Sequence, residues 1–223
     1  IPPVELGSVM RSSGVGKVVE SNHPDFNEGD RVMGMMGWQE YALSNGQGIN
    51  KVQADVPDEA VLSVFALPGL TATQGLFNVG KPKNGETLVV TGAAGSVGSI
   101  VGQLAKAEGL KVIGVVGSFE NTGGPIQNLV VERMNAHGRV VVCGMIADYD
   151  KEVPSPGPSW IPVIKKRLTI QGFTMPDHFE EIPSLLSKLT PYVMSGKIKH
   201  RSHILEGLES AIEGLNLFFT GEN

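Results

Sequence analysis

The chain has 223 residues, with 18 Lys and Arg against 23 Asp and Glu, which gives a formal net charge of −5 at pH 7. This mildly acidic balance lacks the basic surplus that binding to a phosphate backbone needs, so nucleic acid is not expected as a partner. The single cysteine, Cys143, excludes an intramolecular disulfide, and no apolar run reaches the roughly 18 residues of a membrane helix.

The first part of the chain predicts short antiparallel strands, as in a small β-barrel. Apolar runs at residues 15–20, 30–33 and 38–43 are separated by Gly, Pro and Asn. The chain starts at Ile1 and stops directly after an apolar helical pattern, so we expect an incomplete copy.

From residue 57 onward the pattern changes to α/β. Helix starts are predicted at residues 57–60 and 67–75. A buried strand at 87–91, a glycine turn at 92–98, an amphipathic helix at 99–108 and a second strand at 111–116 then form a βαβ unit.

The glycine turn predicts a nucleotide site. Its sequence is Gly92-Ala-Ala-Gly-Ser-Val-Gly98, in which Ala93 occupies the first glycine position of the G-x-G-x-x-G pattern. Such a turn lets the backbone approach a pyrophosphate, and the following helix N-terminus attracts anions. Because of Ala93, a tight turn with glycines only for packing remains an alternative.

The end of the second strand favours NADP over NAD. An acidic residue here would bind the ribose 2′-hydroxyl of NAD, but the sequence reads Gly117-Ser118. Ser118 could donate a hydrogen bond to a 2′-phosphate, and the alternative is an ordinary turn serine.

The next residues conflict with a parallel sheet. One strand ends at Val116 and Phe119 belongs to the end of another, yet parallel neighbours need a crossover of about a dozen residues. We therefore expect a missing stretch between Ser118 and Phe119. Beyond it, the sequence predicts a helix at 125–136, strands at 139–143 and 168–173, a proline-rich loop at 153–162 and a helix at 179–195.

Six motifs in this order resemble a known family. They are residues 66–72 (ALPGLTA), 92–98, 119–124 (FENTGG), 143–149 (CGMIADY), 171–173 (QGF) and 207–209 (GLE). The chain is similar to zinc-independent medium-chain dehydrogenase/reductases, in the leukotriene dehydrogenase and prostaglandin reductase branch that includes bacterial curcumin reductase. The resemblance implies NADPH-dependent reduction of the C=C bond of α,β-unsaturated ketones and aldehydes.

The resemblance also implies the domain organisation. It implies a Rossmann domain with a doubly wound parallel sheet at residues 67–198, inserted into a β-rich, GroES-like catalytic domain at residues 1–66 and 199–223. A homodimer and a cytoplasmic location are expected, with no membrane partner.

The cofactor-lining residues implied by the resemblance follow the motifs. Ala94, Gly95, Ser96 and Val97 are placed at the pyrophosphate, Ser118 near the 2′-phosphate and Thr71 near the nicotinamide. The remaining positions are Asn121, Cys143, Gly144, Met145, Ile146, Ala147, Asp148, Tyr149, Phe173, Thr174, Met175 and Asn223.

Tyr149 is the predicted catalytic residue. It lies in a loop after a sheet strand, where ligands of open α/β sheets gather, whereas Tyr41 and Tyr192 lie in the β-rich start and a C-terminal helix. A phenol O–H there stabilises the negative charge that hydride transfer places on the carbonyl oxygen. An exposed loop tyrosine is the alternative.

Other chemistry is not indicated. His200 and His203 form an H-x-x-H pair without a third ligand, so no metal is expected, and Cys143 is interpreted as a buried strand-end residue rather than a nucleophile. Two other functions stay open: an NADPH quinone oxidoreductase of the same superfamily and a non-catalytic NADP-binding protein.

Overall fold

The chain divides into two compact units. The computed structural model describes residues 3–53, 55–117, 124–145, 148–149, 151–153 and 155–220. Unit 1 comprises Ile1–Ser63 and Arg201–Asn223, and unit 2 comprises Val64–His200. The assignment of catalysis and cofactor binding to the two parts of the chain stays a prediction.

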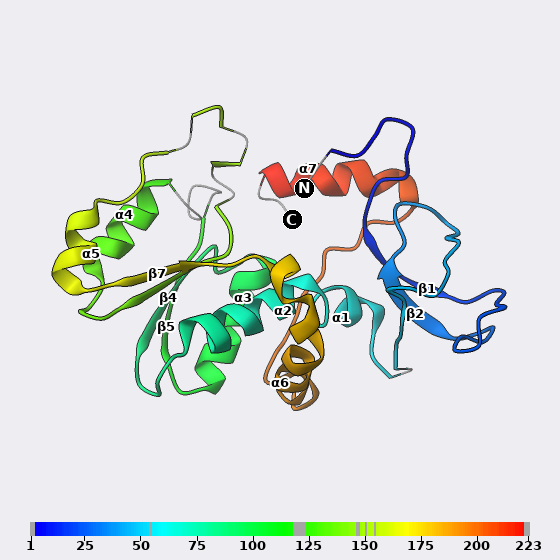
Figure 1. Cartoon of the computed structure of the whole chain (residues 1–223), viewed down its shortest axis with the longest axis horizontal. Helices are drawn as coiled ribbons and strands as arrows, with labels where there is room; N and C mark the ends of the chain where they lie inside the picture. The colour runs from blue at the N-terminus through cyan, green and yellow to red at the C-terminus, as the bar shows by residue number, and fades with distance from the viewer. Residues whose placement is uncertain are drawn as a thin grey trace. The chain divides into compact units, whose positions relative to one another are not determined.

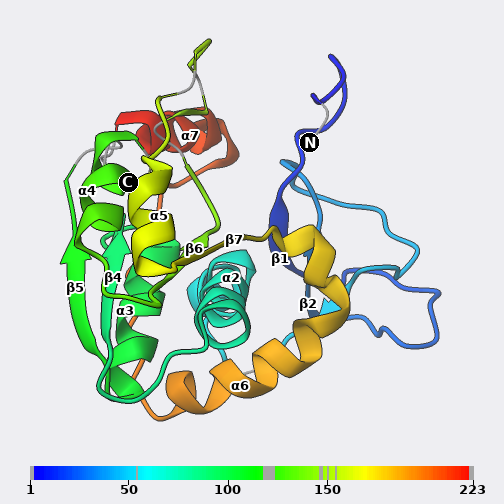
Figure 2. The same cartoon turned by 60° about the vertical axis from the view of Figure 1, so that its left-hand side comes forward.

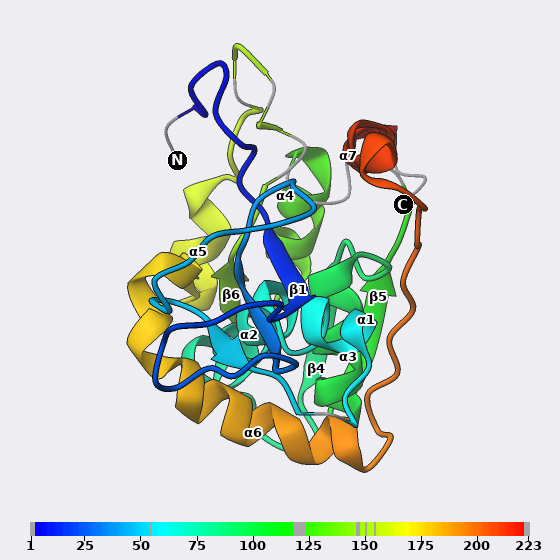
Figure 3. The ribbon, with the colours of Figure 1, turned by 90° about the vertical axis from the view of Figure 1, so that its right-hand side faces the viewer.

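Unit 1 contains a three-stranded antiparallel sheet. Its strands pair in the order β1 (Ser13–Lys17), β2 (Arg31–Met35) and β3 (Asn50–Lys51), with β1 and β2 side by side in Figure 3. The unit also contains helix α1 (Asp58–Leu62), the 3-10 helix η5 (Leu208–Ser210) and α7 (Ala211–Thr220). The Arg31 guanidinium ties the sheet to α1, because it pairs with Asp58 and donates to the carbonyl oxygen of Val56 at 2.9 Å.

The predicted strand at residues 38–43 is wrong. This segment forms bends, although it contains the apolar and aromatic residues Trp38, Tyr41 and Leu43. Gly37 has a left-handed φ of 72°, and the side-chain amide of Gln39 donates to the carbonyl oxygen of Met36 at 2.6 Å. The chain therefore closes a local turn where the sequence pattern predicts an extended strand.

Unit 2 confirms the predicted α/β class with parallel strands. Strand β4 (Thr87–Thr91) pairs in parallel with β5 (Lys111–Val115), and α3 (Ser96–Ala107) is the crossover between them. A second parallel pair joins β6 (Arg139–Val142) to β7 (Thr169–Gly172). Figure 2 shows the two pairs, with α3 beside β4 and β5.

The two strand pairs of unit 2 are connected at their amino ends. Arg139, the first residue of β6, forms an ion pair with Glu86, which directly precedes β4, and its Nε donates to the carbonyl oxygen of Gly80 at 2.6 Å. The pKa of Glu86 is lowered, mainly by the backbone N–H of Lys83 and also by Arg139.

The core of unit 2 lies around α2 (Leu67–Thr73). This helix packs against α3 and against α6 (Ile182–Met194), as Figure 2 shows. It continues without a break into a π-helix, η1 (Gln74–Gly80). The buried apolar cluster that these helices share consists of Val64, Ala72, Leu76, Ile100, Leu104, Ala105, Leu110, Leu189 and Ile198.

Helix α5 (Trp160–Lys166) corrects the loop predicted at residues 153–162. The Ser159 hydroxyl caps it by accepting a hydrogen bond from the N–H of Ile161 at 3.3 Å. Pro162 lies in the first turn, where a missing N–H costs little, so the prolines of this stretch hide a helix start.

The remaining helices of unit 2 follow the predicted order. Helix α4 (Gly124–Arg133) packs beside α5, as Figure 1 shows, and the 3-10 helix η4 (Met175–Glu181) precedes α6. The junction between Ser118 and Phe119 falls outside the described residues, so the missing stretch stays a prediction. In the part of the chain that the structure describes, every helix is too short or too polar to cross a lipid bilayer.

Candidate cofactor and active site

The candidate residues of unit 2 follow the carboxyl ends of its parallel strands. Residues 92–95 come after β4, Cys143–Met145 and Asp148–Tyr149 after β6, and Phe173–Met175 after β7. The carboxyl ends of parallel strands are where open α/β sheets bind their ligands.

The glycine turn is built for close approach of the backbone. Gly92 has a left-handed φ of 60°, and a Cβ at Gly98 would lie 2.3 Å from the carbonyl oxygen of Gly92. Ala93 donates its N–H to the carbonyl oxygen of Val115 at 3.0 Å, which fixes the turn against the end of β5. The turn therefore needs glycine at 98 for packing, and its tip at Ala94, Gly95 and Ser96 is exposed.

The start of α3 fits an anionic group. Gly95 is the N-cap residue, no side chain caps this end, and the first turn carries no acidic residue. The N-terminal N–H groups and the positive end of the helix dipole are thus offered to a ligand such as a pyrophosphate. Ser96 and Val97 lie in this first turn. Their contact with the pyrophosphate of NADPH, which the resemblance implies, stays a prediction.

Tyr149 lies on a short turn after β6. Asp148 donates its N–H to the carbonyl oxygen of Met145 at 2.9 Å, and the Tyr149 hydroxyl accepts a hydrogen bond from the N–H of Met145 at 3.2 Å. The Tyr149 side chain is 71% exposed. Since its oxygen is the acceptor in this contact, the phenol proton is left to donate outward.

Asp148 fixes this loop. Its Oδ1 accepts hydrogen bonds from the hydroxyl and the N–H of Ser155 at 2.6 and 3.1 Å, and from the Lys151 ammonium at 3.1 Å. The Ser155 hydroxyl and the Lys151 ammonium lower the pKa of Asp148. Because Asp148 is ionised and closes the loop onto itself, the neighbouring Tyr149 is held on a defined turn.

Cys143 does not have the features of a nucleophile. It follows β6 directly as expected, but it is exposed, so the predicted burial is wrong. The protein atoms around it desolvate the thiol in part and raise the pKa of Cys143. A raised pKa keeps the sulfur in its less reactive thiol form.

Three contacts stabilise the turn formed by Phe173, Thr174 and Met175. The N–H of Phe173 donates to the carbonyl oxygen of Val142 at 3.1 Å, and the Thr174 hydroxyl donates to Asp177 at 3.1 Å. Met175 is 5% exposed and packs in a buried cluster with Leu70 of α2. This turn is therefore fixed against α2.

Thr71 lies on the same helix, α2. Its hydroxyl donates to the carbonyl oxygen of Leu67 at 2.7 Å, so the oxygen keeps lone pairs with which to accept a hydrogen bond from a ligand. Its predicted contact with the nicotinamide stays a prediction.

A group of polar side chains beside this turn was missed by sequence reasoning. Gln74, at the start of η1, is 2% exposed, and its Nε2 lies 2.9 Å from Nδ1 of His178. The same Nδ1 lies 2.7 Å from Oε1 of Glu181. No local sequence signal could have indicated this group, because Gln74 and His178 are 104 residues apart.

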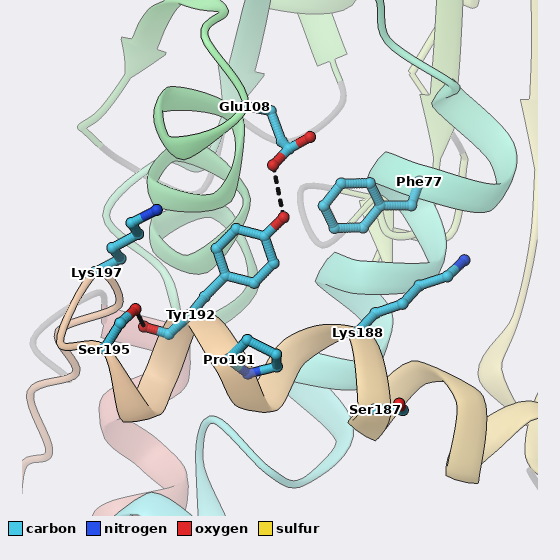
Figure 4. Close-up of a pocket in the computed structure, with 8 residues that line it drawn as sticks. All are labelled: Phe77, Glu108, Ser187, Lys188, Pro191, Tyr192, Ser195 and Lys197. Carbon is cyan, nitrogen blue, oxygen red and sulfur yellow. Dashed lines mark hydrogen bonds between the residues drawn. The ribbon is translucent and has the colours of Figure 1, made fainter.

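Tyr192 belongs to a different surface of unit 2. It lines a pocket of about 530 Å³. In Figure 4 its hydroxyl points toward Glu108, with Phe77, Lys188 and Lys197 around it. The hydroxyl donates to Oε1 of Glu108 at 2.5 Å, and this bond raises the pKa of Tyr192 to about 12. Its proton is therefore already bound to a carboxylate, unlike that of Tyr149.

Five of the predicted cofactor residues fall outside the described residues. They are Ser118, Asn121, Ile146, Ala147 and Asn223. Among the residues that the structure does describe, no three His, Cys, Asp or Glu side chains are grouped so that they could hold a metal ion.

The chain is similar to known oxidoreductases. The family model of the N-terminal domain of oxidoreductase matches residues 1–52. The NADPH-dependent curcumin reductase of Escherichia coli is 35% identical over 269 residues, covering 100% of this chain and 78% of that protein. The NADP(+)-dependent 2-alkenal reductase of Nicotiana tabacum is 33% identical, covering 97% of this chain and 76% of that protein.

A solved structure extends the similarity to three dimensions. CurA from Vibrio vulnificus in complex with NADPH has a TM-score of 0.89 and 30% identity, covering 100% of this chain and 80% of that one. The 269-residue alignment with the Escherichia coli protein is longer than the 223 residues of this chain, so stretches of that relative have no counterpart here.

Proposed function

The chain belongs to the zinc-independent medium-chain dehydrogenase/reductases, in the leukotriene dehydrogenase and prostaglandin reductase branch, and we propose that it uses NADPH to reduce the conjugated C=C bond of an enone or alkenal. Its relatives are NADPH-dependent reductases, so the chain is an oxidoreductase that acts on C=C bonds.

The observation that supports this function is the glycine turn joined to an uncapped helix start. The N–H groups at Ser96 and Val97 would bind the pyrophosphate beside the exposed residues Ala94 and Gly95. The turns after β6 and β7 would line the rest of the cofactor. When bound, NADPH supplies the hydride for the β-carbon of the substrate.

Tyr149 would act on the substrate carbonyl. Reduction at the β-carbon shifts negative charge to the carbonyl oxygen, and a phenol O–H directed there stabilises that charge. Its hydroxyl oxygen is held by the Met145 N–H, while the O–H proton is free to donate and then to be passed on. The Asp148 contacts with Lys151 and Ser155 keep this loop in place.

The test mixes the full-length protein with NADPH and a simple aryl enone and follows the loss of reduced-nicotinamide absorbance, with NADH in parallel. Consumption of NADPH with a saturated C=C bond in the product is the expected result. Consumption only with a quinone would assign the protein to quinone reduction. Tight NADPH binding without any turnover would make it a non-catalytic NADP-binding protein.

A further inference from the structure

Five polar side chains from three helices form one hydrogen-bonded group in unit 2, which we call the His178 cluster. Its members are Gln74 and Asn78 of η1, His178 and Glu181 of η4, and Lys188 of α6. Asn78 Nδ2 donates to Gln74 Oε1 at 2.5 Å and to Glu181 Oε2 at 3.2 Å, and Lys188 Nζ donates to Asn78 Oδ1 at 2.7 Å. His178 and Gln74 close the group.

The cluster restricts the amide of Gln74, which is almost fully buried. Its oxygen accepts from Asn78 at 2.5 Å, and its nitrogen lies 2.9 Å from Nδ1 of His178. Because this Nδ1 also lies 2.7 Å from Oε1 of Glu181, it either accepts from Gln74 or donates to Glu181, and in both tautomers the buried amide is held at its oxygen and lies against the imidazole. Gln74 therefore fixes His178 relative to the junction between α2 and η1.

His178 in turn supports the turn after β7. Its ring packs edge-on against Phe173, with centroids 5.9 Å apart and planes at 68°. The Phe173 ring also lies close to η1, because a Cβ at Gly75 of that helix would lie 3.2 Å from the ring. Loss of the imidazole would leave the Phe173 ring without this edge contact.

The junction between α2 and η1 lies next to residues that are expected to line the cofactor. The π-helix η1 begins at Gln74, directly after α2, and π-helical turns are frequent at functional sites. Thr71 lies on α2 one turn before Gln74, and Phe173–Met175 follow β7. The His178 cluster thus connects the two segments that would line the cofactor from α2 and from β7.

We propose that Gln74 and His178 are positioning residues for NADPH: they fix the Phe173–Met175 turn against α2 and so set cofactor affinity without touching the cofactor. This inference rests on the proposed function. It predicts a change in cofactor binding and in the KM for NADPH, with a smaller change in kcat at saturating NADPH.

The experiment compares NADPH binding, followed by nicotinamide fluorescence, in the wild-type chain and in His178→Ala, His178→Asn and His203→Ala. The Ala variant removes the ring and should weaken NADPH binding about tenfold, within the range for residues coupled in one hydrogen-bond network. The Asn variant keeps a polar group near the position of Nδ1 and should recover part of the loss. His203 is exposed and lies in unit 1, so its replacement is the matched control.

Two readouts separate the possible outcomes. If the wild-type chain neither binds NADPH nor consumes it, the proposed function fails. If the wild-type chain binds NADPH and His178→Ala binds it equally well, the inference alone is overturned, even if the variant unfolds at a lower temperature. A raised KM with nearly constant kcat in a folded His178→Ala variant, together with recovery in His178→Asn, supports the positioning role.

Discussion

A Cβ atom at Gly98 would lie 2.3 Å from the carbonyl oxygen of Gly92. The first turn of α3 is therefore packed directly against the turn that follows β4, and the glycine at 98 is a steric requirement of that contact. The same contact brings the N-terminus of α3 to the carboxyl end of the strand.

Replacing Gly98 by alanine should damage both stability and cofactor binding. The new methyl group meets backbone, which cannot move aside as a flexible side chain could, so α3 must shift. We expect a loss of about 1–3 kcal/mol in the free energy of unfolding, measured by urea denaturation, and weaker NADPH binding.

Gly102→Ala is the matched control for this prediction. Gly102 lies on the same helix, and a Cβ there would meet only Val112 at 3.8 Å, an ordinary contact. Alanine is favoured over glycine inside a helix, so this variant should gain up to about 1 kcal/mol. Equal behaviour of the two variants would show that the contact between Gly98 and Gly92 is not limiting.

Leu104→Ala should destabilise unit 2. The side chain of Leu104 is fully buried in the cluster shared by α2, α3 and α6, so truncation leaves a cavity. The expected loss in the free energy of unfolding is about 2–5 kcal/mol. Leu129 on α4 is 47% exposed, and its replacement by alanine should change stability by less than about 1 kcal/mol.

The bond between Tyr192 and Glu108 predicts a pH effect on stability at high pH. The pKa of Tyr192 rises from its ordinary value of 10.0 to about 12 in the folded chain, chiefly through the bond to Glu108. The folded state therefore holds this proton more tightly than the unfolded state. The resulting stability is complete below pH about 10 and is lost as the pH rises toward 12.

Tyr192→Phe isolates this effect from the titration of other groups. The difference in the free energy of unfolding between wild type and Tyr192→Phe should shrink between pH 10 and 12. A difference that stays constant over this range would mean that the Glu108 bond does not control the Tyr192 proton.

The local patterns of the sequence predict the βαβ unit but not its surroundings. The strand at Thr87–Thr91, the glycine turn and α3 follow from residues that are neighbours in sequence. The strand predicted at 38–43 is absent, because Gly37 and Gln39 form a turn that apolar spacing does not reveal. Helix α5 was hidden by prolines that a first helical turn tolerates.

The candidate site, too, is predictable from the sequence only in part. Motif order predicts which loops carry the cofactor residues. The described ones lie after β4, β6 and β7, apart from Thr71 on α2, and their contact with a cofactor stays a prediction. The contact of Gln74 with His178 depends on tertiary packing between segments 104 residues apart, and a single sequence carries no signal for it.

Tyr149→Phe tests the proposed catalytic group. The change removes one hydroxyl from a side chain that is 71% exposed, so the Met145 N–H that it frees is open to water and the fold should be kept. We expect kcat with an aryl enone to fall by about a hundredfold, at the low end of the usual contribution of a general acid. NADPH binding should be unchanged, because the variant loses only the hydroxyl group and keeps the aromatic ring.

The matched control for Tyr149→Phe is again Tyr192→Phe, which removes the same atom from a tyrosine whose proton is held by Glu108. This variant should lower stability and leave kcat near the wild-type value. A Tyr149→Phe variant with wild-type turnover would remove the phenol from the mechanism and leave charge stabilisation to another donor. A parallel loss of NADPH affinity would instead place Tyr149 in cofactor binding, so binding and turnover must be measured on the same preparation.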